Sequence, residues 1–142
     1  MKVLTVRNPH AWAIIYAGKT VENRDWDTSY RGTLLIHASA SREDCPDDSY
    51  DYPDGLCKFP DGTLIPYVAE MVFGAIIGAV DLVDVVKQGH VKVKGNVWAG
   101  GPYCFLLENP RPLAQPYFCK SQLKLWELPA SVDAAVKGQL RN

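Results

Sequence analysis

The stretch Met71-Val-Phe-Gly-Ala-Ile-Ile-Gly-Ala-Val-Asp-Leu-Val-Asp-Val-Val86 carries the strongest structural signal in this chain of 142 residues. Its β-branched and other apolar residues predict one long, buried β-strand. Gly74 and Gly78 interrupt it and predict bulges or tight curvature, such as a small barrel requires. The apolar run closes at Asp81 and is much shorter than the ~20 residues of a membrane-spanning helix, so we expect no membrane contact.

Shorter strands flank this stretch on both sides. Apolar patterning predicts strands at 2–7, 19–24 and 30–38 before it, and at 103–108 and 124–128 after it. Residues 91–97 alternate only weakly. The strand at 30–38 is expected to be central, because residues 34–36 are apolar on both faces of a sheet. Residues 109–112, Asn-Pro-Arg-Pro, are expected to end the strand at 103–108.

Two short helices complete the predicted fold. Asn8-Pro9 supplies the N-cap and the first residue of a helix that continues over 11–17 and ends at Gly18. A second helix is predicted over 129–137. Many short strands with few helices indicate an α+β fold, here a small closed β-barrel decorated with a short N-terminal helix and a C-terminal helix.

The chain shows no internal repeat or linker, so we expect residues 1–142 to form a single domain with a long acidic insertion at about 40–66. Residues 42–61 carry seven acidic and two basic side chains, a local charge of −5. Residues 87–142 carry eight basic and three acidic ones, so the net charge of −1 conceals a polarised chain. This polarity permits a local phosphate contact but argues against binding of long duplex DNA. The insertion is either a solvated loop or a contact for a protein partner.

The four cysteines, Cys45, Cys57, Cys104 and Cys119, form no C-x-x-C pair and lie far from the three histidines in sequence. Metal sites usually have closely spaced ligands, so we expect no metal and no cofactor. Reduced thiols are typical of a cytoplasmic protein, and a Cys45–Cys57 bridge stays open as the alternative. Residues 1–7 lack the apolar segment of a secretory signal, which also favours a cytoplasmic location.

The densest polar cluster is Gly18-Lys-Thr-Val-Glu-Asn-Arg24, within an otherwise core-building part of the chain. Strand alternation places Thr20, Glu22 and Arg24 on one face and Lys19 on the other. Lys19 therefore either belongs to the preceding turn or extends its ammonium into the barrel interior. A lysine and a carboxylate brought close in a partly buried place are typical of functional sites. The alternative is a solvated edge strand with a weak Glu22–Arg24 ion pair, worth about 0–1 kcal/mol.

Other candidate site residues lie outside this cluster. Trp26 and Tyr30 stand among polar residues, so we expect them to be exposed and able to stack on a base, at about 1–3 kcal/mol each. Asp81 keeps the alternation of its strand and is a candidate to point into a cavity, whereas Asp84 is expected to cap a loop. His37 could act as a general base, but a histidine at a strand end is more often structural.

Several segments resemble the ASCH domain, a family of the PUA-like superfamily. They are Leu4-Thr-Val-Arg-Asn-Pro-His-Ala-Trp-Ala-Ile14, Gly18-Lys-Thr-Val-Glu-Asn-Arg24, Tyr30-Arg-Gly32 and Leu35-Ile-His-Ala-Ser39. The family hallmark is a Gly, a Lys, a Glu and an Arg that follow a short helix, matched here at Gly18, Lys19, Glu22 and Arg24. The similarity continues at 74–78 and 103–110, and it leaves out the acidic excursion and the last residues.

This resemblance implies a barrel whose cleft lies at the hallmark and holds RNA or a nucleotide. Lys19, Arg24 and Arg7 would contact phosphate or base acceptors, and Trp26 or Tyr30 would stack on the base. Glu22 would accept a hydrogen bond from a base amino group, as carboxylates do with cytosine. Asp81 is added to these candidate nucleotide-binding residues, and Lys19 and Glu22 are the candidate catalytic residues.

Some members of the family resemble amidohydrolases that remove the acetyl group of N4-acetylcytidine, and a ribonuclease activity is suggested for another branch. In a metal-independent enzyme of either kind, Glu22 or Lys19 would activate water or a ribose 2′-hydroxyl and Arg24 would stabilise the oxyanion. The amidohydrolase branch carries Lys-x-x-Thr with Thr as the nucleophile. Here Glu22 stands at that position and Thr20 directly follows Lys19, so the nucleophile does not carry over. Binding of a nucleotide or RNA base therefore ranks first, and hydrolysis second.

Overall fold

The computed structural model describes residues 1–45 and 58–140. Within these residues, six strands form one mixed sheet in the order β2-β5-β4-β3-β1-β6. The strands are β1 (Lys2–Val6), β2 (Val21–Arg24), β3 (Gly32–Ala38), β4 (Ala75–Lys87), β5 (Tyr103–Phe118) and β6 (Leu125–Glu127). The helices are α1 (His10–Tyr16) and α2 (Ala130–Gln139), with short 3-10 turns at η1 (Val68–Glu70) and η2 (Val91–Val93). None of the described helices is long and apolar enough to cross a membrane.

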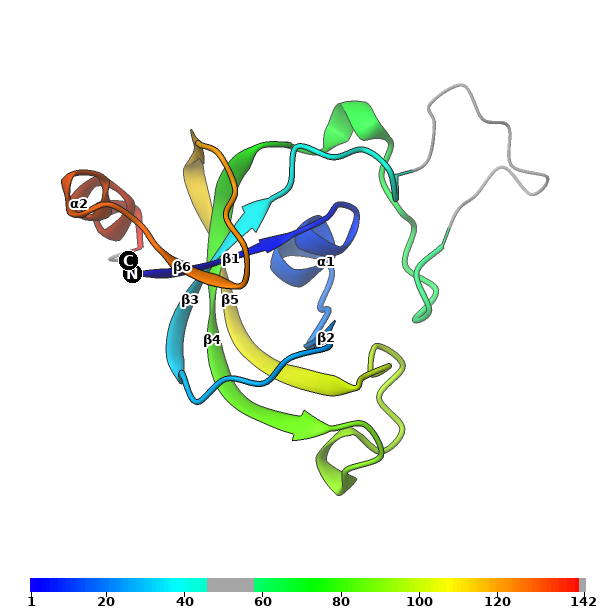
Figure 1. Cartoon of the computed structure of the whole chain (residues 1–142). Coiled ribbons are helices and arrows are strands. Elements are labelled where there is room, and N and C mark those ends of the chain that lie inside the picture. Colours follow the sequence, from blue (N-terminus) through cyan, green and yellow to red (C-terminus); the bar gives the residue numbers. More distant parts are fainter. Residues whose placement is uncertain (46–57, 141–142) are drawn as a thin grey trace.

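The sheet curls around α1 as a half-barrel (Figure 1). β1 pairs with β3 in parallel, and the other neighbouring strands pair antiparallel. In the part of the chain that is described, the sheet ends at β2 on one side and β6 on the other, so it is open. The α+β half-barrel with two helices agrees with the prediction. The predicted closed barrel is wrong, because the sheet is open. The outer strands are short, four residues for β2 and three for β6. Because β6 pairs only with residues 2–4 of β1, the edge of β1 beyond Leu4 meets β2 without a strand ladder.

The bulge predicted at Gly78 is confirmed, whereas Gly74 lies before the long strand, which begins at Ala75 rather than at residue 71. The register between β4 and β5 shifts between Ile76 and Gly78, which is the irregularity predicted for this position. A Cβ on Gly78 would lie 2.6 Å from the carbonyl oxygen of Arg111 and 2.7 Å from Cδ1 of Ile15. The missing side chain therefore lets α1 and β5 approach β4 closely.

Both faces of the sheet are covered, as the apolar pattern of residues 34–36 predicted. Leu34 and Ile36 face α1 in the core on the concave side. Leu35 lies in a second core on the opposite side, together with Trp126 of β6 and Val136 of α2. All three β3 residues are fully buried, and β3 lies inside the sheet between β4 and β1.

The strand predicted at 103–108 does not stop at the Asn-Pro-Arg-Pro segment. β5 continues to Phe118, with Asn109 in the left-handed region at φ 54° where the strand bends. β2 pairs with β5 at Val21–Leu106 through Arg24–Tyr103, so the second half of β5 has an open edge. A proline lacks an N–H, and on an open edge that N–H is not needed for a strand ladder.

Three other boundaries differ from the predictions. Pro9 occupies the N-cap position of α1 itself, and Asn8 instead accepts the Trp12 N–H on its side-chain oxygen at 3.0 Å. The weakly alternating segment 91–97 begins as η2 and contributes no strand. α2 continues to Gln139.

The acidic insertion is described only at its two ends. Its outgoing end is fixed by the Cys45 thiol, which donates to the carbonyl oxygen of Asn8 at 3.1 Å. Its returning end buries Phe59, which stacks on Trp12 with ring centroids 6.1 Å apart. Cys45 is a free thiol, in line with the predicted reduced cysteines rather than with a Cys45–Cys57 bridge. Cys57 and most of the predicted partner-binding acidic loop lie outside the described residues.

Candidate functional site

A cleft of about 660 Å³ lies on the open side of the half-barrel, between β1 and β2. Its volume falls within the range of about 300–1,000 Å³ that is common for small-molecule sites. The ends of β1 and β2, the start of α1 and the loop between β5 and β6 form its walls. The lining residues include Thr5, Arg7, His10, Glu22, Asn23, Arg24, Asp44 and the loop residues Ser121 to Lys124.

Gly18 directs the hallmark residues toward this cleft. It adopts a left-handed conformation at φ 72°, and the following Lys19 N–H donates to the carbonyl oxygen of Ala13 at 3.1 Å. The left-handed glycine predicted just past the helix is therefore confirmed, although α1 itself ends at Tyr16 with Ala17 as its C-cap. Lys19 lies in the turn before β2 and its side chain is also buried, so both alternatives left open by the sequence hold at once.

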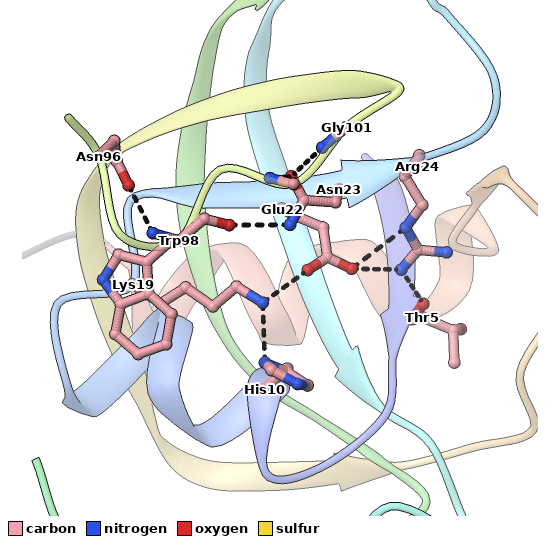
Figure 2. A network of polar contacts seen from close by, with 10 residues as sticks. Thr5, His10, Lys19, Glu22, Asn23, Arg24, Asn96, Trp98 and Gly101 are labelled. Carbon is pink, nitrogen blue, oxygen red and sulfur yellow. Dashed lines mark hydrogen bonds and ion pairs between the residues drawn. The ribbon is translucent and has the colours of Figure 1, made fainter. Parts of the chain in front are cut away.

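Glu22 is the centre of a buried chain of charges (Figure 2). Its Oε1 lies 3.1 Å from Lys19 Nζ, and its Oε2 accepts from Arg24 Nε at 3.1 Å and Nη2 at 2.9 Å. The side chains of Lys19 and Glu22 are 4% and 9% exposed, and that of Arg24 is 22% exposed. The weak, solvated pair considered from sequence is therefore excluded: this carboxylate is buried and held between two cations.

Arg24 also forms a side-chain bridge across the open side of the sheet. Its Nη2 donates to the backbone carbonyl oxygen of Thr5 at 2.8 Å. Thr5 belongs to β1, which is not a neighbour of β2 in the sheet. One guanidinium thus joins two strands that share no ladder, at the floor of the cleft.

His10 is a member of this site that sequence reasoning did not select. Its Nδ1 lies 2.8 Å from Lys19 Nζ, and its ring lines the cleft. Burial lowers the pKa of His10, and the charge of Lys19 lowers it further, while Glu22 and Asp44 act in the opposite direction. The residue spacing gave no signal, because the contact depends on the path of α1 and of the turn after it.

Asn23 is a second residue that the sequence did not reveal. Its side-chain Nδ2 donates to the carbonyl oxygen of Trp98 at 2.8 Å, and its Oδ1 accepts from the N–H groups of Gly100 and Gly101 at 2.8 and 3.0 Å. These contacts hold the loop that carries Trp98 (Figure 2). The Trp98 ring lies 5.8 Å from Lys19 Nζ, so the clamped loop covers the ammonium with an aromatic face.

Arg7 lines the mouth of the cleft but is not free. Its guanidinium lies 3.3 Å from Glu43 and 3.5 Å from Asp44, in the described beginning of the acidic insertion. Asp44 itself lines the cleft. The insertion therefore sets the charge at the mouth, a relationship that the sequence order did not reveal.

Four predicted site residues lie outside the lining of the cleft: the buried Lys19, and Trp26, Tyr30 and Asp81. Trp26 packs edge-on against Phe105 at 5.1 Å, and Tyr30 donates to the Thr33 carbonyl oxygen, so both are partly buried against the core rather than exposed. Trp26 still approaches the cleft, because Lys124 Nζ lies 5.9 Å from its ring. Asp81 pairs with Arg111 at 3.1 Å and is not brought together with Lys19 or Glu22.

Two polar residues have the structural roles that the sequence favoured. His37 is 1% exposed, and its Nε2 donates to the Cys119 carbonyl oxygen at 2.7 Å. Asp84 accepts from the Val85 N–H at 2.9 Å and pairs with Lys92 at 2.5 Å. Across residues 1–45 and 58–140, no three His, Cys, Asp or Glu side chains are grouped so as to hold a metal ion.

Comparisons with known proteins agree with this fold. The ASCH domain family matches residues 4–100. Activating signal cointegrator 1 of Homo sapiens is 26% identical over 137 residues, and its Mus musculus counterpart is 23% identical over the same length. The match covers 94% of this chain but 23% of each relative, so this chain spans less than a quarter of their length. Crystal structures of an ASCH protein from Zymomonas mobilis, unsubstituted and in mutant form, align over 96% of this chain at TM-scores of 0.53 and 0.55 and 14% identity. These alignments cover 93% of the unsubstituted protein's chain and 94% of the mutant's chain.

Proposed function

This chain belongs to the ASCH domain family, a PUA-like family associated with RNA binding, and we propose that its cleft binds a nucleobase or nucleotide. The ligand is either free or an unpaired base of single-stranded RNA. The observation that carries the proposal is the buried Lys19–Glu22–Arg24 chain, which ends on the wall of the cleft. A charged network held dry by the fold is costly to bury, and it provides fixed polar groups for a ligand.

The mouth of the cleft suits a small or single-stranded ligand better than a duplex. Arg7 is already paired with Glu43 and Asp44, which lowers the positive charge available to a phosphate backbone. Lys124 and the 91% exposed Leu123 stand on the opposite wall. An apolar side chain beside a lysine can contact a base or ribose while the ammonium approaches one phosphate.

Hydrolysis of a modified nucleoside or of RNA is the second candidate, because the Glu22 carboxylate reaches the cleft wall. Two features favour binding over this reaction. In the described part of the chain, Glu22 accepts two N–H bonds from Arg24 and forms an ion pair with Lys19, and these contacts stabilise the charged carboxylate and so weaken it as a general base. Thr20 is exposed, and its hydroxyl oxygen accepts from Asn96 Nδ2 at 3.1 Å outside the cleft lining, so it is not a nucleophile there.

Equilibrium titration of the purified chain with the four ribonucleosides, their 5′-monophosphates and a short single-stranded RNA tests the proposal. We expect Glu22→Gln to weaken binding at least about tenfold, because the isosteric amide cannot pair with both Lys19 and Arg24. Glu108→Gln is the matched control, since Glu108 is exposed on β5 and outside the cleft lining. No binding by the wild-type chain, or equal binding by Glu22→Gln, would contradict the proposal.

The same samples distinguish the second candidate. Incubation with N4-acetylcytidine and with the RNA, followed by chromatography, reports any product. Product formation that Glu22→Gln abolishes and EDTA leaves unchanged would replace binding by hydrolysis as the main activity.

A further inference from the structure

The imidazole of His10 has one tautomer that its surroundings allow. An ammonium group has three N–H donors and no acceptor, so in the 2.8 Å contact Lys19 Nζ donates and His10 Nδ1 accepts. The proton of the neutral ring is therefore on Nε2. The neutral form is itself favoured, because burial and the charge of Lys19 both lower the pKa of His10.

This Nε2–H faces the cleft without a protein partner. Among residues 1–45 and 58–140 it makes no hydrogen bond, whereas Nδ1 is held by Lys19. None of the buried side-chain nitrogen and oxygen atoms in these residues is unpaired, so this nitrogen is open to solvent. Figure 2 shows the ring below the Lys19–Glu22 contact, with its second nitrogen turned away from Lys19. The ring also lines the cleft.

We propose that His10 is a ligand-contacting residue that donates its Nε2–H to a carbonyl oxygen of the bound base. Lys19 is then a positioning residue, which acts on the ligand through His10 rather than by contact. The burial of Lys19 supports this division, because its side chain is 4% exposed and does not line the cleft, whereas His10 does. The inference rests on the proposed function and adds a substrate class to it.

The substrate class follows from the donor. Uracil, cytosine and guanine carry a carbonyl oxygen, whereas adenine carries an amino group and ring nitrogens. The acceptor nitrogens of adenine lie within its ring, whereas a carbonyl oxygen stands about 1.2 Å outside it, so a donor placed for that oxygen is left unpaired by adenine. The unpaired donor loses a hydrogen bond that water made before binding. We therefore expect uridine, cytidine or guanosine to bind at least about tenfold more tightly than adenosine.

The first experiment needs no ligand. Nitrogen-15 NMR of the imidazole rings distinguishes protonation at Nδ1 from protonation at Nε2. At pH 7 we expect His10 to be neutral and protonated at Nε2, and Lys19→Met to shift it toward a mixture of tautomers. Lys19→Gln, which keeps a neutral donor, is expected to restore the Nε2–H form. A wild-type His10 that is protonated at Nδ1, or doubly protonated at pH 7, would overturn the inference.

The second experiment titrates nucleosides into His10→Phe, which keeps a ring but has no donor. We expect the preference for carbonyl-bearing bases over adenosine to disappear in His10→Phe and to return in part in His10→Gln. His90→Phe is the matched control, because His90 is exposed and outside the cleft lining. If the wild-type chain binds nucleosides and His10→Phe keeps the same preference, the role of His10 alone is refuted. If the wild-type chain binds none of them, the proposed function fails, and this inference fails with it.

Discussion

The guanidinium of Arg24 donates to the backbone carbonyl of Thr5 at 2.8 Å and so connects β2 to β1 where the sheet is open. The same guanidinium grips Glu22 through Nε and Nη2. A barrel that closes by backbone pairing would leave no room for a polar cleft at this seam. Here one side chain replaces the missing ladder, and the cleft lies beside it.

Arg24→Lys is expected to destabilise the fold by about 1.5–3 kcal/mol, the usual range for hydrogen bonds to charged groups. A lysine has a single terminal nitrogen and cannot hold Glu22 at two points while donating to Thr5. Urea unfolding followed by circular dichroism measures this change. Arg111→Lys is the control, because Arg111 makes its ion pair with Asp81 away from the cleft. Equal destabilisation by the two variants would contradict the bridging role of Arg24.

Gly78→Ala is expected to destabilise the chain by about 1–3 kcal/mol, since its new Cβ would overlap the Arg111 carbonyl oxygen and the Ile15 side chain. Gly138→Ala is the opposite case. Nothing lies within 4 Å of the Cβ that it adds within α2, so we expect stabilisation of about 0.5–1 kcal/mol. Thermal unfolding measures both changes. If Gly78→Ala leaves the stability unchanged, α1 does not pack on β4 as closely as described.

Asn23→Ala is expected to release the loop that carries Trp98, because it removes three hydrogen bonds to that loop. Amide hydrogen exchange should speed up at Gly100 and Gly101 by one or more orders of magnitude, for a local loss of about 1–3 kcal/mol. The amides of Leu34 to Ile36 in β3 serve as the internal reference. If the two glycine amides exchange as slowly as in the wild type, Asn23 does not hold the loop.

The stability of the fold is expected to fall as the pH drops below about 6.5, the usual pKa of histidine. Burial lowers the pKa of His37 in the folded state, although its hydrogen bond to the Cys119 carbonyl opposes this. The unfolded chain therefore binds a proton first, and the stability present above pH 6.5 is lost as the pH falls through the folded-state pKa. His10, whose pKa is also lowered, adds to the same pH window.

Urea unfolding of His37→Gln between pH 5 and 8 separates the contribution of His37 to the pH dependence from that of His10. The glutamine amide can still donate to Cys119, and we expect a flatter pH dependence with a residual part from His10. His90→Gln is the control, because His90 is exposed. A pH dependence as steep in His37→Gln as in the wild type would assign the effect to other groups.

Glu43→Gln combined with Asp44→Asn is expected to release Arg7 and to strengthen binding of a 5′-monophosphate relative to its nucleoside by about 2–5-fold. The gain should shrink at high salt, because Arg7 is exposed. Asp61→Asn combined with Glu70→Gln makes the same charge change outside the cleft lining. An equal gain in that control would mean that net charge, rather than Arg7, is responsible.

Several parts of the fold and site could be predicted because they depend on neighbours in sequence. The left-handed Gly18 after α1, most of the strand predicted at 71–86 and the two-sided burial of β3 follow from backbone sterics and apolar periodicity, although β4 begins only at Ala75. Glu22 and Arg24 share a face because they are two residues apart on a strand. The ion pair of Glu22 with Lys19 also joins residues that are close in sequence, only three positions apart.

Other parts depend on what lies beside a residue in space. Trp26 and Tyr30 have polar neighbours along the chain, yet both pack on the core. For Trp26 the reason is that the curled sheet brings Phe105 of β5 against its ring. The prolines of β5 predict the end of the strand, but they lie where β2 no longer pairs with it, so the strand continues. Sequence patterns do not say which half of a strand has an open edge.

By itself, the sequence determined the family, the α+β class and the Lys19–Glu22–Arg24 cluster, since each depends on residue types at short and regular spacing. The tertiary structure alone decided that the sheet stays open, that His10 receives the ammonium of Lys19, and that Arg7 is held by the acidic insertion. The physical reason is that these contacts require the curvature of the whole sheet around α1. That curvature arises from the packing of both cores at once and is not present in any single segment of the chain.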